Sequence, residues 1–330
     1  MRKRVLVIGS GKRAQNAILP ALWCLRDTHE VVAVLSRHEK DLTLFRGQYS
    51  VTTATSLASV DLPTIDLLFI AVTLRQVPAV LQSLSAYDTS RITLFLDTPV
   101  LAPQQLGSVR AFKRFKDVRA TEDTIALPPF LLAKKILEAP LKTVHFFHSG
   151  YKYHALASMK MLTGSSIRSM RGQRFPMRHQ RKDIRFANGV RGILWEPRDY
   201  DRGKLLLTTS NAGLADYPHA DPRIRRMGYI VENHIYRGMT LDGVAVVGDA
   251  TDEKYLRSIT DDIPDASPMN TMKIRGLLDL ILDVDAPISR FRYDPIDAIW
   301  DNVSMLLADK VGWAPAGTVF KRLLRFLEGR

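Results

Sequence analysis

The chain has 330 residues, of which 46% are hydrophobic and 25% are charged. It is too long for one compact core, so we expect two domains. Lysine and arginine number 47 against 34 aspartate and glutamate, and the formal charge of +13 favours anionic partners. The single cysteine excludes an intrachain disulfide framework. No apolar run is long enough for a membrane span or a signal peptide, so we expect a cytoplasmic protein.

The first predicted elements are a buried strand at residues 5–8 and a helix that begins near Ala14. Between them lies a Gly-x-Gly-x-x-Ala sequence, and a second buried strand follows at residues 31–35. Glycines between a strand and a helix permit a tight turn whose backbone N–H groups face a pyrophosphate. The turn therefore predicts a dinucleotide site, with candidate residues Gly9, Ser10, Gly11, Arg13 and Ala14.

The end of the second strand predicts which dinucleotide binds. An NAD site places a carboxylate there for the ribose hydroxyls, whereas a 2′-phosphate requires a cation and no carboxylate. This chain has Ser36 and Arg37 at that point, with Lys40 close behind. We therefore predict NADP(H), with Arg37 against the 2′-phosphate.

Three further strands are predicted at residues 65–72, 92–96 and 118–120, with helices at 77–84 and 102–115 between them. Alternating strands and helices predict a doubly wound parallel sheet, with a ligand across the carboxyl ends of its strands. Val72, Thr73 and Asp97 lie at such ends and complete the predicted cofactor site.

The order of these motifs resembles the Gfo/Idh/MocA oxidoreductases over about the first 120 residues, and more loosely through His154. The resemblance implies an NADP-binding Rossmann domain at residues 1–120. It also implies a substrate-binding and oligomerisation α/β domain at 121–330, with a large open, mostly antiparallel sheet. The implied activity is hydride transfer between a nicotinamide and a carbonyl, carbinol or related carbon of a small molecule. A homodimer or homotetramer is expected.

Three positions depart from the pattern of the family. Members usually have Glu-Lys-Pro after the fourth strand, where this chain has Asp97-Thr98-Pro99. They carry an Asp four residues before the histidine that matches His154, where this chain has Gly150. A Thr-Pro-Asn sequence of the family is replaced by Val72 and its two successors.

Three interpretations remain open. In the first, Lys152, Tyr153 and His154 carry out the proton transfer in place of the missing family residues, and Thr98 orients a substrate oxygen or a water. Alternatively, the substrate is an activated, imine-type carbon that needs little acid help. In the third interpretation the chain has lost turnover and is a dinucleotide-binding, ligand-sensing or regulatory protein.

The positive charge is concentrated in residues 151–210, with 13 basic and 4 acidic side chains. The densest part, residues 160–191, suits carboxylate or phosphate groups of an anionic substrate. Nucleic acid is disfavoured because only Phe175 and Phe186 interrupt the run as stacking residues. No metal site is expected, since His145 and His148 would lie on opposite faces of a strand at 143–148.

The rest of the second half contains predicted strands at 192–195, 204–209 and 244–247 and helices at 269–282 and 296–310. Apolar and basic residues alternate at helical spacing in 319–327, which predicts an amphipathic helix that docks on the body of the protein.

Overall fold

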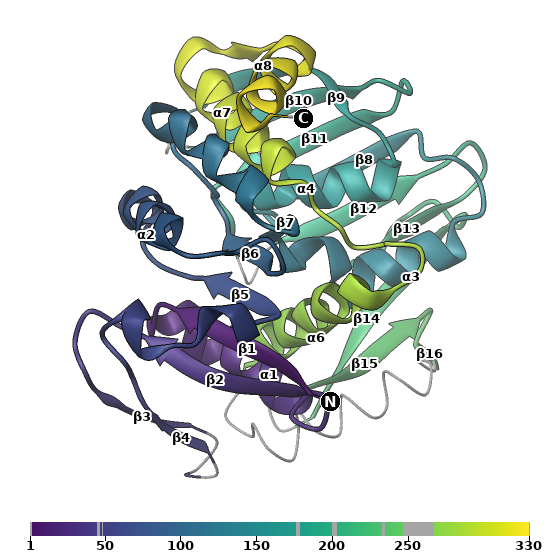
Figure 1. Cartoon of the computed structure of the whole chain (residues 1–330). Coiled ribbons are helices and arrows are strands. Elements are labelled where there is room, and N and C mark those ends of the chain that lie inside the picture. Colours follow the sequence, from purple (N-terminus) through teal and green to yellow (C-terminus); the bar gives the residue numbers. More distant parts are fainter. Residues whose placement is uncertain are drawn as a thin grey trace. The chain divides into compact units, whose positions relative to one another are not determined.

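The computed structural model describes residues 2–44, 47, 49–175, 179–199, 203–232, 235–246 and 267–329 (Figure 1). The chain forms two compact units. The first takes the described residues of 1–123, 250–299 and 321–330, and the second those of 124–249 and 300–320. Each unit therefore contains segments from distant parts of the sequence. The continuous division at residue 120 stays a prediction.

The first unit contains a five-stranded sheet in the order β2-β1-β5-β6-β7, with every neighbouring pair parallel. Its central strands are largely buried on both faces because most of their side chains are apolar. The predicted doubly wound sheet is confirmed. Its strands are β1 (Lys3–Ile8), β2 (His29–Leu35), β5 (Leu67–Ile70), β6 (Thr93–Asp97) and β7 (Asp117–Thr121). A separate hairpin pairs β3 (Asp41–Leu44) with β4 (Tyr49–Thr52).

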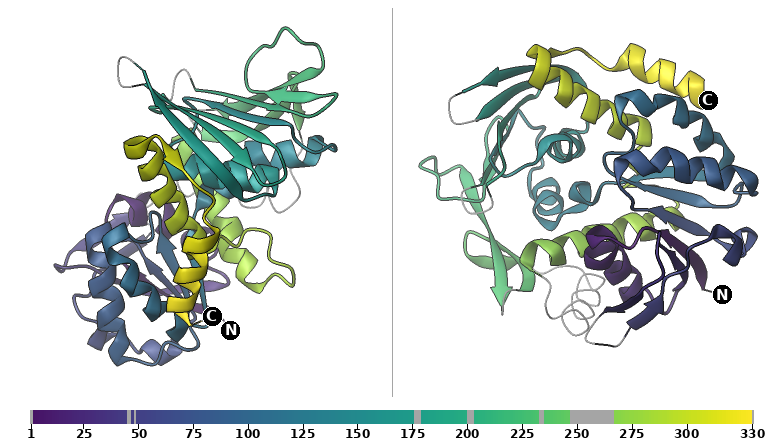
Figure 2. Two further views of the ribbon diagram at one scale, coloured as in Figure 1. Left: turned by 90° about the horizontal axis from the view of Figure 1, so that it is seen from above. Right: turned by 90° about the vertical axis from the view of Figure 1, so that its left-hand side faces the viewer.

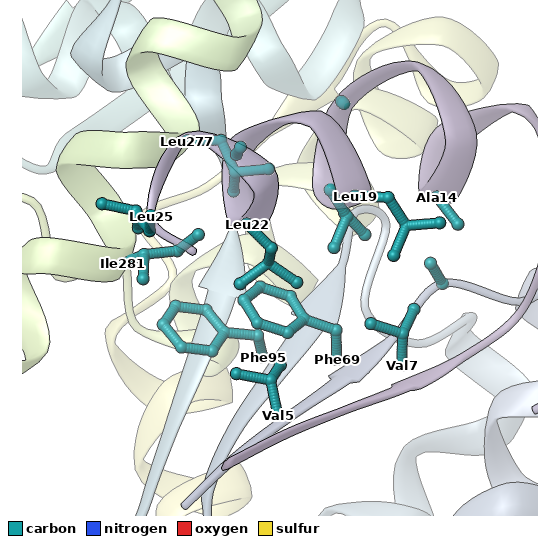
Figure 3. Packing of buried hydrophobic residues seen from close by; sticks show 14 of the residues in the cluster. Val5, Val7, Ala14, Leu19, Leu22, Leu25, Phe69, Phe95, Leu277 and Ile281 are labelled. Atoms are coloured by element: carbon teal, nitrogen blue, oxygen red, sulfur yellow. The ribbon is translucent and has the colours of Figure 1, made fainter. Parts of the chain in front are cut away.

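Helical segments flank this sheet. They are the π-helical turn η1 (Ala14–Ile18), α1 (Leu19–Cys24), α2 (Val77–Ser83), the 3-10 helix η7 (Pro103–Arg114) and α6 (Pro268–Leu282). Leu277 and Ile281 of α6 lie against Leu22 and Leu25 in one buried cluster (Figure 3). Burying a leucine or isoleucine contributes roughly 1.5–3 kcal/mol. The helix predicted at 269–282 therefore belongs to the core of the first unit, although residues 124–249, whose described part belongs to the second unit, precede it in sequence (Figures 1 and 2).

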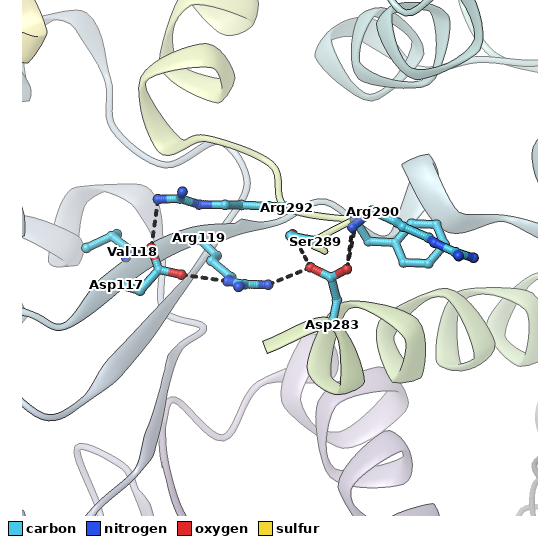
Figure 4. A network of polar contacts seen from close by, with 8 residues as sticks. Asp117, Val118, Arg119, Asp283, Ser289, Arg290 and Arg292 are labelled. Atoms are coloured by element: carbon cyan, nitrogen blue, oxygen red, sulfur yellow. Dashed lines mark hydrogen bonds and ion pairs between the residues drawn. The ribbon is translucent and has the colours of Figure 1, made fainter. Parts of the chain in front are cut away.

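Ionic contacts join the end of α6 to the last strand of the parallel sheet (Figure 4). The nearly buried Arg119 binds Asp117 and Asp283, each at 2.8 Å. Burial opposes the charge of Asp283, but hydrogen bonds from Ser289, two backbone N–H groups and Arg119 outweigh it and lower the pKa of the carboxyl group. These contacts hold the segment after α6 against β7.

The second unit contains a ten-stranded sheet in the order β16-β15-β14-β13-β12-β8-β11-β10-β9-β17. Only β8 with β11 and β13 with β14 are parallel pairs, which confirms the large, mostly antiparallel sheet. Its strands are β8 (Thr143–Phe147), β9 (Ile167–Arg174), β10 (Gln180–Phe186), β11 (Arg191–Glu196), β12 (Lys204–Thr208), β13 (Gly213–Ala215), β14 (Ile224–Glu232), β15 (Ile235–Leu241), β16 (Val244–Val246) and β17 (Trp313–Ala314).

The helices α3 (Pro128–Ile136) and α4 (Lys152–Thr163) belong to this second unit, and α4 contacts β8 and β11. The chain passes between the units within α7 (Pro295–Val311) and again within α8 (Thr318–Glu328). In the described part of the chain, no helix is long and apolar enough to cross a membrane. The end of the predicted strand 244–247 lies outside the described residues.

Candidate functional site

The glycine turn follows β1 directly. Gly9 has φ +114°, and a Cβ atom at this position would lie 2.2 Å from the carbonyl oxygen of Ala71. Only glycine allows this conformation and this approach of two backbones. At Gly11, by contrast, a Cβ would meet no atom of the described residues within 4 Å. The backbone is therefore packed at the first glycine and open at the second.

The helix after the turn contains a π-helical segment, in which the N–H of Leu19 donates to the carbonyl of Ala14 five residues earlier. The cause is Pro20, which lacks an N–H and would clash with the carbonyl four residues before it in a regular α-helix. Ala14 is fully buried in the core cluster. Its small side chain lets the helix lie close to the sheet.

A groove of about 730 Å³ opens at the carboxyl ends of β1, β2 and β5. Seven predicted cofactor residues line it: Gly9, Ser10, Gly11, Ser36, Arg37, Val72 and Thr73. Lys40, which the sequence places just behind Arg37, lines it as well. The lining also includes residues that were not predicted to line it: Thr55, Ser56, Leu57, Gln76, Val80, Ser83, Ala86 and Tyr87. Among the described residues of this lining there are two cations and no carboxylate. The groove therefore favours an anion.

Short polar contacts connect the glycine turn to the end of β2 and to nearby side chains. Ser10 donates from its hydroxyl to that of Ser36 at 2.9 Å, which joins the glycine turn to the end of β2. The ammonium of Lys40 lies 3.3 Å from the carbonyl oxygen of Ser10, and Gln15 donates to the same oxygen at 2.7 Å. The hydroxyls and cations predicted for the adenosine end of a dinucleotide thus lie together.

Arg37 reaches from β2 to the segment after β5. With the Gln76 amide oriented so that its oxygen faces the guanidinium, this oxygen accepts from Nε at 3.0 Å and from Nη2 at 2.6 Å. The amide nitrogen then donates to the hydroxyl of Thr73 at 2.8 Å. Sequence reasoning missed Gln76, because its partner is 39 positions away in the chain.

Arg13, Ala14 and Asp97 do not line the groove, although all three are in the predicted cofactor set. The guanidinium of Arg13 binds Asp97 at 3.0 Å and Asp123 at 2.8 Å, and it donates to the carbonyl of Thr121 at 3.3 Å. Burial opposes the charge of Arg13, but the two carboxylates together outweigh it and raise the pKa. In this structure Arg13 links the ends of β6 and β7.

Thr98 follows β6 directly, and its peptide bond to Pro99 is cis. The side chain is half-buried. It is the predicted catalytic residue contributed by the first unit.

The other predicted catalytic residues form an aromatic group at the start of α4. The rings of Tyr153 and His154 lie 4.4 Å apart between centroids, and Tyr151 lies 6.1 Å from His154. The ammonium of Lys152 is 5.5 Å from the centre of the Tyr151 ring. The structure thus brings Lys152, Tyr153 and His154 together, as predicted from their adjacency.

Gly150 explains one departure from the family pattern. A Cβ atom here would lie 2.6 Å from both the Cβ of Ala155 and a ring carbon of Phe146. An aspartate therefore does not fit at this position with the present backbone. The packing of α4 against β8 therefore leaves no space for the carboxylate that family members carry at this position.

A buried ionic cluster holds the start of α4. The carboxylate of Glu196 accepts from the backbone N–H of Lys152 at 3.0 Å and also binds the ammonium of Lys182. Lys182 is fully buried and binds Asp309 at 2.8 Å as well. Lys152 has φ +40°, a left-handed conformation rare for a side-chain-bearing residue. The carboxylate at the helix N-terminus stabilises this first turn.

Four arginines of the basic run 160–191, Arg171, Arg181, Arg185 and Arg191, lie on the sheet face opposite the one that α4 covers. Lys182 and Ile184 are buried on the covered face, and α4 contacts it where Met159 lies near Gly192. Side chains alternate along a strand, so the other face carries Arg181 and Arg185. Their cross-strand neighbours and the next row of the ladder place Arg171, Asp183, Arg191, Ile193, Trp195, His145 and Phe147 there too. Arg178 lies outside the described residues.

Two lysines of the run are neutralised inside the second unit. Lys160 binds Asp301 at 2.9 Å, and Lys182 belongs to the buried cluster. His148 is not in β8, because that strand ends at Phe147 and His148 has φ +55°. Within the described ranges no group of three potential metal ligands occurs.

Comparisons with known proteins support the fold. Residues 4–98 match the family described as NADP oxidoreductase coenzyme F420-dependent. An oxidoreductase from Thermotoga maritima shares 12% identity and covers 97% of this chain and 100% of its own, with a TM-score of 0.62. Myo-inositol dehydrogenase from Lactobacillus casei in complex with NAD(H) and myo-inositol has 13% sequence identity with this chain. The match covers 94% of each chain, with a TM-score of 0.57.

Aldose-aldose oxidoreductase from Caulobacter crescentus complexed with glycerol has 12% sequence identity with this chain. The match covers 96% of this chain and 100% of that protein, with a TM-score of 0.62. No curated protein matches the sequence. The predicted resemblance to the Gfo/Idh/MocA oxidoreductases is therefore confirmed at the level of the fold, over both the Rossmann part and the large sheet.

Proposed function

We propose that this protein is an NADP(H)-dependent oxidoreductase. It transfers a hydride between C4 of the nicotinamide and a carbonyl, carbinol or imine-type carbon of a small substrate. The observation that carries the proposal is the groove at the glycine turn, whose described lining presents Arg37 and Lys40 and no carboxylate. The description of the family that matches residues 4–98 names NADP and supports the same cofactor.

The groove residues fit a phosphorylated dinucleotide. The open space at Gly11 leaves room for a pyrophosphate against the backbone, and Gly9 keeps the turn tight. Ser36 and Arg37 stand at the end of β2, where the adenosine ribose lies in Rossmann folds. A guanidinium binds a phosphate through two parallel hydrogen bonds, so we assign Arg37 to the 2′-phosphate. Bound nicotinamide would supply the hydride chemistry.

We assign proton transfer or substrate orientation to His154, assisted by Lys152 and Tyr153. An imidazole exchanges protons near neutral pH, and the adjacent rings restrict its movement. Thr98 has a hydroxyl that donates and accepts, which suits it to orient a substrate oxygen or a water. The family lysine is absent at position 98, so an activated carbon such as an imine is the alternative substrate.

The proposed substrate is small and anionic, because the ammonium of Lys152 at the start of α4 would attract a negatively charged group. The arginines of the other sheet face take no part in this assignment. That face combines Ile193 and Trp195 with charged residues around them, which is typical of a protein interface. We propose that a second copy of the chain covers it in a cytoplasmic homodimer or homotetramer.

The cofactor assignment is tested with Arg37→Glu. The new carboxylate removes the phosphate ligand and repels a 2′-phosphate, but it can accept from ribose hydroxyls. We expect NADPH affinity to fall by about 100-fold or more while NADH affinity is kept or improved. Fluorescence titration with each dinucleotide measures this change. Arg91→Glu, at an exposed position outside the groove, is the control. Unchanged NADPH affinity in Arg37→Glu would refute the assignment.

The catalytic assignment is tested with His154→Ala. Removing a proton-transferring group lowers turnover by about 10²- to 10⁴-fold, and we expect cofactor affinity to stay within about twofold. The assay follows reduced nicotinamide absorbance during turnover of ketone, alcohol and imine substrates. His219→Ala, on an exposed segment of the same unit, should keep full activity. An active His154→Ala enzyme removes His154 from the mechanism. Tight NADPH binding by the wild type without any turnover favours a ligand-sensing protein instead.

A further inference from the structure

We infer that Gln76 is a positioning residue that sets the preference for NADP over NAD by holding Arg37 in its phosphate-binding orientation. The inference rests on the proposed function and adds a specificity determinant to it. Gln76 and Arg37 come from different strand ends, after β5 and β2, and both line the groove.

The contact uses one edge of the guanidinium. The Gln76 oxygen accepts from Nε and Nη2, at 3.0 and 2.6 Å. Arginine has five N–H donors in a fixed plane, so the other edge, formed by Nη1 and the second hydrogen of Nη2, remains available. Two parallel N–H groups on that edge match the oxygens of a phosphate. Gln76 therefore orients the guanidinium without competing for its ligand.

Gln76 is itself held in place. Its amide nitrogen donates to the hydroxyl of Thr73, the residue at the N-cap position of the 3-10 turn η5 (Leu74–Gln76). Pro78 at the start of α2 restricts the backbone that follows. Arg37 is exposed and, without such a partner, would lose more side-chain entropy on binding an anion. The rigid segment after β5 thus provides the fixed support.

The neutral amide matters as much as the geometry. A carboxylate at position 76 would also bind Nε and Nη2, but its charge would neutralise Arg37 and repel a 2′-phosphate nearby. Glutamine supplies the acceptor without the charge. The two substitutions Gln76→Leu and Gln76→Glu therefore separate the loss of support from the addition of charge.

The test is titration of NADPH, NADH and 2′,5′-ADP into the wild type, Gln76→Leu and Gln76→Glu, with a thermal unfolding scan of each. Gln82→Leu, an exposed glutamine of α2 outside the groove lining, is the matched control. We expect Gln76→Leu to weaken NADPH and 2′,5′-ADP binding by about tenfold and Gln76→Glu by about 100-fold. NADH affinity should stay within about twofold in both variants.

The outcomes separate the inference from the proposed function. A wild type that binds neither dinucleotide contradicts the proposed function itself. A wild type that prefers NADPH, together with a Gln76→Leu variant of unchanged preference, overturns only the inference. Equal weakening of NADPH and NADH also overturns it, because a purely structural role lowers both affinities and leaves their ratio unchanged.

Discussion

Replacing Lys182 with methionine is expected to lower the free energy of unfolding by about 3–5 kcal/mol, the usual cost of removing one member of a buried ion pair. Lys182 is fully buried between the carboxylates of Glu196 and Asp309. Without its ammonium, the two carboxylates, whose side chains are 7% and 18% exposed, lose the positive charge that lies between them. Urea unfolding followed by circular dichroism measures the change.

Arg181→Met is the matched control, because Arg181 is adjacent in sequence but lies on the opposite face of β10. Its side chain is 33% exposed and pairs with Asp183, and an exposed pair contributes about 0–1 kcal/mol. We expect a loss within that range. A Lys182→Met protein as stable as Arg181→Met would show that the buried cluster does not stabilise the second unit.

Gly9→Ala is expected to destabilise the first unit by about 3 kcal/mol or more and to abolish dinucleotide binding. The left-handed φ of +114° is strained for alanine, and the added methyl would overlap the carbonyl oxygen of Ala71 at 2.2 Å. Relief of that overlap requires β1 and the turn after β5 to move apart. Thermal unfolding and NADPH titration measure the two effects.

Gly11→Ala separates folding from binding at the same turn. In the described part of the chain no atom lies within 4 Å of a Cβ at Gly11, so the free energy of unfolding should change by less than about 0.5 kcal/mol. The methyl would instead occupy the space assigned to the pyrophosphate and weaken NADPH binding. Equal destabilisation of the Gly9 and Gly11 variants would contradict the different packing of the two glycines.

Local sequence patterns predicted the parallel sheet because its strands are continuous apolar runs that need no information from distant residues. The same patterns missed β9 and β10, where arginines alternate with buried side chains such as Met170 and Ile184. A charged run indicates a solvated face, and this one is solvated on one side only. Lys182 belongs to this charged run, and its burial could not be predicted because its two carboxylate partners are 14 and 127 positions away in the chain.

The cofactor site also combines residues that local sequence patterns predicted with contacts that only the folded chain determines. Seven of its predicted residues line the groove. Some belong to one contiguous strand, turn and helix, and the others lie at the carboxyl ends of parallel strands, where ligands bind in such sheets. Arg13 belongs to the same motif, yet its guanidinium is bound to Asp97 and Asp123. Which acceptor a long side chain reaches depends on neighbours that only the folded sheet supplies.

The sequence by itself therefore determined the Rossmann elements, the glycine turn, the cation at the end of β2 and the absence of the family lysine. Each depends on residue type and short spacing. The tertiary structure decided that α6 completes the first core, that no aspartate fits at Gly150 and that Gln76 supports Arg37. These features depend on packing between segments far apart in the chain, where volume and hydrogen-bond geometry select the partners.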